Sequence, residues 1–166
     1  MQIYEYKTIL AGDGRNILAR EREQTYGGTE RIVSPQDTVQ IMRDVFRLHE
    51  CAEEYVWLVC LDNGGKPAGF FEVSHGTCSY APAQPREILV RALLCGASCI
   101  ILAHNHPGRD PAPSGEDRRL TERIRKASGL VGIRFLDHVI IGGSCFYSFR
   151  KEEPWEETDE MKGEKQ

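Results

Sequence analysis

The sequence lacks the features that mark membrane, secreted and disulfide-bonded proteins. It has no apolar run of the ~18 residues that a membrane-spanning helix needs, and its N-terminus has no basic stretch followed by an apolar signal core. None of the six cysteines forms a C-x-x-C pair, and four stand in apolar segments, which favours reduced, mostly buried thiols. We therefore expect a soluble protein of the cytoplasm with no membrane partner.

An excess of basic charge is also missing. The formal net charge is −4, and residues 151–166 alone hold seven acids against three lysines, so the rest of the chain has 18 acidic and 18 basic side chains. A duplex-binding surface usually appears as net positive charge. The composition therefore gives a nucleic-acid partner no support, although a local basic patch would be compatible with it. Residues 151–166 are predicted to be a charged acidic tail.

What the chain does contain is an alternation of strand and helix patterns within the length of one ordinary domain. Strands are predicted at 2–10, 16–20, 55–61, 68–74, 98–103, 133–141 and 145–149, and helices from Ser34 to near His49, from Pro85 to near Gly96, and from Ser114 to near Gly129. This order predicts an α+β domain with a mixed sheet packed by helices. Residues 1–33 are predicted to be an N-terminal β-hairpin and connector, and 34–150 the main domain.

Two histidines at the end of an apolar segment are the first sign of chemistry. His104 and His106 follow the predicted strand 98–103 and are two residues apart, so in a strand both imidazoles project from the same face. A His-x-His pair alone is a weak signal. Eleven residues after His106, Asp117 stands at the start of a predicted helix and offers a carboxylate. Two imidazoles and one carboxylate make an open zinc site with the fourth position left for water.

A zinc hydrolase needs two further groups. A carboxylate outside the ligand set should take a proton from the activated water, and Glu54, before the predicted central strand, is our candidate, with Glu53 as the alternative. A hydroxyl should stabilise the oxyanion, and Ser114 is suitably placed. Simpler interpretations stay open. Ser114-x-x-Asp117 also fits a helix capping box, and Glu54 also fits a solvated loop acid.

Taken together, Glu54, His104-x-His106-Pro107 and Ser114-x-x-Asp117 resemble the JAMM motif of the JAB/MPN metalloprotease superfamily. The RadC-like branch is the closer match, on the following further segments: Leu61-Asp62, Ser74-x-Gly76-Thr77, Pro85-Arg86-Glu87, Ala103 to Pro107, Pro113-Ser114 and Leu136-Asp137-His138. The resemblance covers roughly residues 34–150. It departs at Gly108-Arg109, where the family usually has Ser-Gly.

The resemblance implies a layered MPN/JAB fold of the cytidine-deaminase-like kind, with a curved mixed sheet between helices. It implies one Zn²⁺ bound by His104, His106 and Asp117, with Glu54 as general acid/base and Ser114 supporting the oxyanion. Superfamily members cleave peptide or isopeptide bonds, so a zinc-dependent metallopeptidase or isopeptidase acting on a peptide or isopeptide-linked substrate is the leading hypothesis.

Two other functions are weighed against this hypothesis. The RadC-like branch has long been labelled as DNA repair, so one alternative is a repair or mobile-element accessory protein whose metal site is structural or vestigial. The near-neutral charge of residues 1–150 leads us to expect little DNA binding. A nuclease is the other alternative, and it fits poorly because the sequence shows no second carboxylate cluster for a two-metal site.

Overall fold

The computed structural model describes residues 1–76 and 83–155. Thr77 and Cys78, and the acidic tail beyond Trp155, lie outside the described residues. The elements in chain order are β1 (Gln2–Leu10), β2 (Asn16–Thr25), α1 (Pro35–Asp44), η1 (Leu48–Glu50), β3 (Tyr55–Leu61), β4 (Pro67–His75), α2 (Pro85–Cys95), β5 (Cys99–Asn105), α3 (Gly115–Leu130), β6 (Arg134–Gly142), β7 (Cys145–Ser148) and α4 (Phe149–Glu152).

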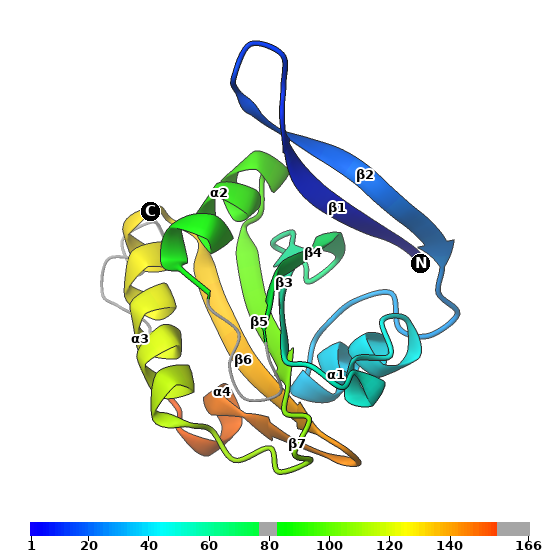
Figure 1. The fold of residues 1–166 in the computed structure, drawn as a ribbon, viewed down its shortest axis with the longest axis vertical. Coiled ribbons are helices and arrows are strands. Elements are labelled where there is room, and N and C mark those ends of the chain that lie inside the picture. Colours follow the sequence, from blue (N-terminus) through cyan, green and yellow to red (C-terminus); the bar gives the residue numbers. More distant parts are fainter. Residues whose placement is uncertain (77–82, 156–166) are drawn as a thin grey trace.

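The seven strands form one mixed sheet with the order β2-β1-β4-β3-β5-β6-β7. The pairs β1/β4 and β5/β6 are parallel, and the other neighbours are antiparallel. Helices α2 and α3 lie on one side of the sheet and α1 on the other, while the β1–β2 hairpin extends from the molecule (Figure 1). The predicted mixed α/β fold is confirmed.

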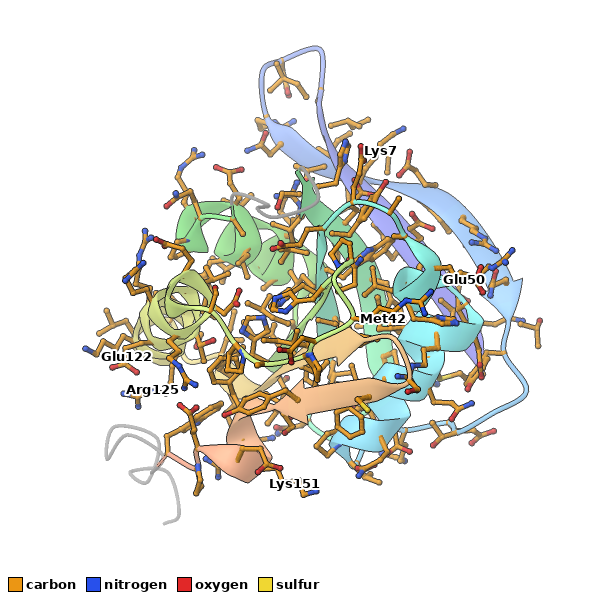
Figure 2. All side chains as sticks on the ribbon, turned by 60° about the horizontal axis from the view of Figure 1, so that its bottom comes forward. Lys7, Met42, Glu50, Glu122, Arg125 and Lys151 are labelled. Carbon is orange, nitrogen blue, oxygen red and sulfur yellow. The ribbon has the colours of Figure 1, made fainter. Side chains whose placement is uncertain are left out.

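Each face of the sheet builds its own hydrophobic core because side chains alternate along buried strands. On the α1 side, Ile41 and Met42 of the helix pack with Val59 of β3 and Ile101 of β5, and Met42 points into this core (Figure 2). On the other side, residues of α2 and α3 pack with the alternate residues of the same strands. The central strands β3 and β5 are therefore buried on both faces.

Two predicted boundaries were wrong. The helix expected to reach His49 ends at Asp44, because the chain turns at Arg47, whose φ of 50° is left-handed, into the short helix η1. Strand β2 continues to Thr25 instead of ending at residue 20, because it pairs with β1 as far as the register Gln2↔Thr25. No helix in residues 1–76 and 83–155 is long and apolar enough to span a membrane.

Candidate metal and active site

Strand β5 brings the first histidine to the α3 side of the sheet. Ile100 and Leu102 of this strand pack in the core under α2 and α3, so His104, two residues further on, projects to the same side. His104 is buried, whereas the side chain of His106, just beyond the strand, is 18% exposed. The Nε2 atoms of the two rings are 3.0 Å apart. The two imidazoles therefore converge, as the spacing predicts.

Helix α3 supplies the carboxylate. Ser114 is its N-cap, and Asp117 occupies the third helical position, where it is buried. Asp117 Oδ1 lies 3.3 Å from His104 Nε2, and its Oδ2 lies 3.5 Å from His106 Nε2. One ligand atom from each of these three residues lies within 4.8 Å of the others, so the group could hold a metal ion. Two imidazole nitrogens and one carboxylate oxygen in a half-enclosed position fit an open zinc site.

The other ring nitrogen of each histidine has a partner. His106 Nδ1 lies 2.8 Å from the carbonyl oxygen of Asp110. Because a carbonyl oxygen only accepts, this nitrogen carries a proton, and Nε2 is the ring nitrogen that faces Asp117. His104 Nδ1 lies 2.8 Å from Nε2 of His138, which is fully buried. Partners of this kind hold the ring of a metal-binding histidine in one orientation.

The electrostatics of the group favour an ionised carboxylate. Burial alone raises the pKa of Asp117, but the hydrogen bond with His106, the nearby imidazole of His104 and the hydrogen bonds from Ser114 together hold it well below its ordinary value. Burial lowers the pKa of His104 and lowers that of His138 to about 4. The hydrogen bond with Asp117 raises the pKa of His106. The site therefore holds a charged acid beside a neutral imidazole at its buried end.

Glu54 enters the site from the start of β3. Val56 pairs with His104 in the sheet, and Glu54, two residues earlier, is buried and lines the same cavity as the histidines. The side chain of Asn105, between the two histidines, fixes this segment. Its Oδ1 accepts a hydrogen bond from Tyr55 N at 2.9 Å, and its Nδ2 donates to the carbonyl of Glu53 at 2.9 Å. The position of the Glu54 carboxylate is thus tied to β5, the strand that leads to both imidazoles.

The two catalytic predictions can be placed in the structure. Glu54 is buried at the cavity wall, whereas the alternative, Glu53, is exposed. Ser114 forms the predicted capping box: its Oγ accepts from Asp117 N at 3.2 Å, and its own N donates to Asp117 Oδ2 at 2.7 Å. It also lines the cavity. The structure therefore brings Glu54 and Ser114 to the same cavity as His104, His106 and Asp117.

This cavity has a volume of about 560 Å³, in the usual range for small-molecule and peptide side-chain pockets. Beyond the five residues already described, its wall includes Gln84, Arg119, Leu120 and Arg123. Arg123 donates a hydrogen bond to Gln84 at 2.9 Å. The cavity wall along α3 therefore carries polar side chains of both charges, with Glu116 as well as Arg119 and Arg123.

A model of the RadC-like JAB domain family matches residues 32–154. This chain belongs to that family. The UPF0758 protein of Alkaliphilus metalliredigens is 36% identical over 138 residues, 83% of this chain and 57% of that protein. The UPF0758 protein of Geotalea uraniireducens is 39% identical over 120 residues, 72% of this chain and 52% of the relative. The UPF0758 protein of Vibrio cholerae is 40% identical over 122 residues, 74% of this chain and 76% of that protein. The chain thus spans about half the length of the first two relatives.

The departure from the RadC-like pattern after His106 places an arginine at a left-handed position of the loop. Arg109 N donates to the carbonyl of His106 at 2.9 Å, and Arg109 has a left-handed φ of 64°. Glycine, which the family usually has here, takes this conformation without steric cost. The loop packs on the β6–β7 turn, and the side chain of Arg109 lies against Gly143. This packing holds Arg109 in the left-handed conformation.

Sequence reasoning missed the groups behind the ligands. Asn105 and His138 stand out in the sequence only as members of segments that carry the family resemblance, with no role of their own. Thr121 and the carbonyl of Asp110 gave no signal. A period-of-four reading of α3 from Asp117 would have placed Thr121 on its buried face. The contact of His138 with His104, 34 residues away, depends on strand pairing.

Proposed function

We propose that this RadC-like JAB domain is a zinc-dependent hydrolase of amide bonds, of the peptidase or isopeptidase type. The observation that carries the proposal is the convergence of His104, His106 and Asp117 to within 4.8 Å in a cavity that Glu54 also lines. The donor set of two nitrogens and one oxygen is that of catalytic zinc sites with an open position. The nearby carboxylate is what separates a hydrolytic site from a purely structural one.

The three ligands would hold the metal through His104 Nε2, His106 Nε2 and the carboxylate of Asp117. When bound, zinc supplies a water of lowered pKa and polarises the substrate carbonyl. Burial of His104 and Asp117 keeps bulk water from competing for these atoms. Peptide and isopeptide bonds both present a carbonyl of this kind, so we propose a peptide or isopeptide-linked substrate.

Glu54 would move the proton. It takes a proton from the attacking water as the new carbon–oxygen bond forms, and it gives that proton to the amine that leaves when the carbon–nitrogen bond breaks. Ser114 would stabilise the oxyanion. Its oxygen already accepts from Asp117 N in the helix cap, and its hydroxyl proton can point toward the cavity. The capping and catalytic roles are therefore compatible.

The test combines metal content with a substrate scan. The purified chain, loaded with zinc and measured by elemental analysis, should bind one zinc ion per chain. It should cleave members of a peptide library or a lysine-linked isopeptide, with products identified by mass spectrometry. Glu54→Gln should keep the metal and lower the cleavage rate by ~10²–10⁴-fold.

Glu53→Gln is the matched control, because it removes the adjacent exposed carboxylate and should leave both zinc and rate unchanged. Equal cleavage by wild type and Glu54→Gln would contradict the proposal. So would a chain that binds no zinc. Metal retention without cleavage of any amide, together with salt-sensitive binding of duplex DNA, would favour the accessory-protein alternative.

A further inference from the structure

A chain of buried hydrogen bonds runs from the backbone of α3 to the first metal ligand. Thr121 Oγ1 lies 2.6 Å from the carbonyl oxygen of Asp117 and 2.6 Å from His138 Nδ1. His138 Nε2 lies 2.8 Å from His104 Nδ1. All four residues are buried. The chain therefore links two of the three candidate ligands, through the side chain of one and the backbone of the other.

Counting protons fixes the direction of every bond in this chain. The carbonyl oxygen of Asp117 only accepts, so Thr121 spends its single hydroxyl proton on it. Thr121 Oγ1 can then only accept from His138, so the proton of His138 is on Nδ1. Because the His138 ring is fully buried between a hydroxyl and an imidazole, it is held neutral, and its Nε2 has no proton.

The last bond follows from the others. A bare His138 Nε2 must accept from His104, so His104 carries its proton on Nδ1 and presents an unprotonated Nε2 to His106 and Asp117. We propose that Thr121 and His138 are positioning residues that set the tautomer and ring orientation of His104 for metal binding. This inference rests on the proposed metal site for its purpose, but its proton count does not depend on a metal.

The packing around His138 keeps the chain in place. Its ring stacks on Phe149 with centroids 5.1 Å apart and an interplanar angle of 12°. Its backbone N donates to Asp137 Oδ1 at 2.7 Å, and the same carboxylate accepts from Ser148 Oγ at 2.6 Å. The ring therefore has little freedom to rotate out of the chain.

The Nδ1 protons of the two histidine ligands are held by different partners. His106 Nδ1 donates directly to a backbone carbonyl, which no side-chain substitution removes. His104 reaches a backbone carbonyl only through two side chains. Substitutions in this chain of hydrogen bonds should therefore change the tautomer of His104 and leave that of His106 unchanged. His106 is thus the internal reference of the experiment.

The experiment compares Thr121→Val with Thr121→Ser. Valine has nearly the shape of threonine but no hydroxyl, so His138 loses the acceptor for its Nδ1 proton and can instead protonate Nε2 and donate to His104. Serine keeps the hydroxyl. Long-range proton–nitrogen NMR of the metal-free protein, labelled with ¹⁵N-histidine, reads each tautomer directly. Zinc affinity is measured by competition with a chelator.

We expect the metal-free wild type and Thr121→Ser to show His104 protonated on Nδ1. Thr121→Val should show a population protonated on Nε2 and bind zinc ~10–100-fold more weakly, with His106 unchanged in all three proteins. Thr121→Ser should bind zinc as tightly as the wild type. A loss of packing alone would not explain weaker binding in Thr121→Val, because valine nearly keeps the shape of threonine.

The outcomes separate this proposal from the function. A wild-type His104 protonated on Nε2 would overturn the tautomer assignment without any variant being needed. Equal zinc affinity in wild type and a folded Thr121→Val would also overturn it. The expected tautomers in a protein that binds no zinc would support the hydrogen-bond chain while refuting the metal site.

Discussion

Two helices of this domain begin with the same sequence pattern, and only one begins at the site. Ser34-x-x-Asp37 starts α1 and Ser114-x-x-Asp117 starts α3. In both, the serine oxygen accepts from the aspartate N–H, at 3.3 Å and 3.2 Å, and the serine N–H donates to the carboxylate, at 2.8 Å and 2.7 Å. The local geometry of the two caps is therefore nearly the same.

The difference lies in what faces each carboxylate. Asp37 Oδ2 also accepts from Val33 N at 3.0 Å and from Ser34 Oγ at 2.8 Å, which are neighbours in its own segment. Asp117 faces the imidazoles that β5 carries to the edge of the sheet. A capping box thus orients a carboxylate outward from the start of a helix. Whether that carboxylate can take part in a metal site depends on whether the sheet places other ligands beside it.

The largest effect should come from removing the charge in both caps. Asparagine keeps an oxygen that can accept the cap hydrogen bonds, so both variants should keep their caps, and Asp117→Asn should lose more stability than Asp37→Asn because it also weakens the hydrogen bond with His106. Only Asp117→Asn removes a ligand, and it should weaken zinc binding by more than ~100-fold. Calorimetric titration of both metal-free proteins checks this. Comparable zinc loss in Asp37→Asn would end the contrast between the two helix starts.

The serines should separate stability from catalysis. Ser34→Ala and Ser114→Ala each remove the side-chain cap, and each should lower the free energy of unfolding by about 1 kcal/mol. If Ser114 also supports the oxyanion, Ser114→Ala alone should lower the amide cleavage rate by ~10²–10³-fold with zinc retained. Urea denaturation and steady-state kinetics on the same samples measure both. A full cleavage rate in Ser114→Ala would leave that serine with its capping role alone.

The same contrast shows what the sequence could and could not predict. The caps, the apolar strand and the two-residue spacing of the histidines are local patterns, and the ligand group follows from them together with one assumption, that the start of α3 lies beside the end of β5. The tie from Asn105 to residue 55 and the bond from His104 to His138 span 50 and 34 residues. Such contacts depend on the order of strands, which periodicity does not specify.

Two glycines lie against the backbone segments that precede α1 and α3, and they allow a further comparison of the two helix starts. A Cβ on Gly65 would lie 2.7 Å from the carbonyl oxygen of Ile32, before α1, and φ at Gly65 is 80°. A Cβ on Gly142 would lie 2.6 Å from Pro111 N and 2.7 Å from Arg109 O, in the loop between His106 and α3. Both contacts are with backbone, so the approaching segment itself must move.

Alanine at either glycine should therefore lower the free energy of unfolding by ~1–3 kcal/mol. Only Gly142→Ala should displace the loop that carries His106 and weaken zinc binding, by ~10-fold. Thermal unfolding of the metal-free proteins and chelator competition measure the two quantities. A Gly65→Ala protein that binds zinc as weakly as Gly142→Ala would show that the site responds to general loosening of the fold.

The smallest effect should come from the outer side of α3, which points away from the sheet and carries Glu122 and Arg125 (Figure 2). The pKa of Glu122 is lowered to about 2 by hydrogen bonds from Arg125 and then Lys126. The contribution of this group to stability is therefore complete above its ordinary pKa of 4.5 and is lost as the pH falls toward 2. Because Glu122 and Lys126 are exposed and Arg125 is only half-buried, Glu122→Gln should lower the free energy of unfolding by less than ~0.5 kcal/mol at pH 7, and high salt should remove the difference. Zinc affinity should not change. Altered affinity in this variant would mean that the outer surface of α3, and not only its face toward the sheet, determines the site.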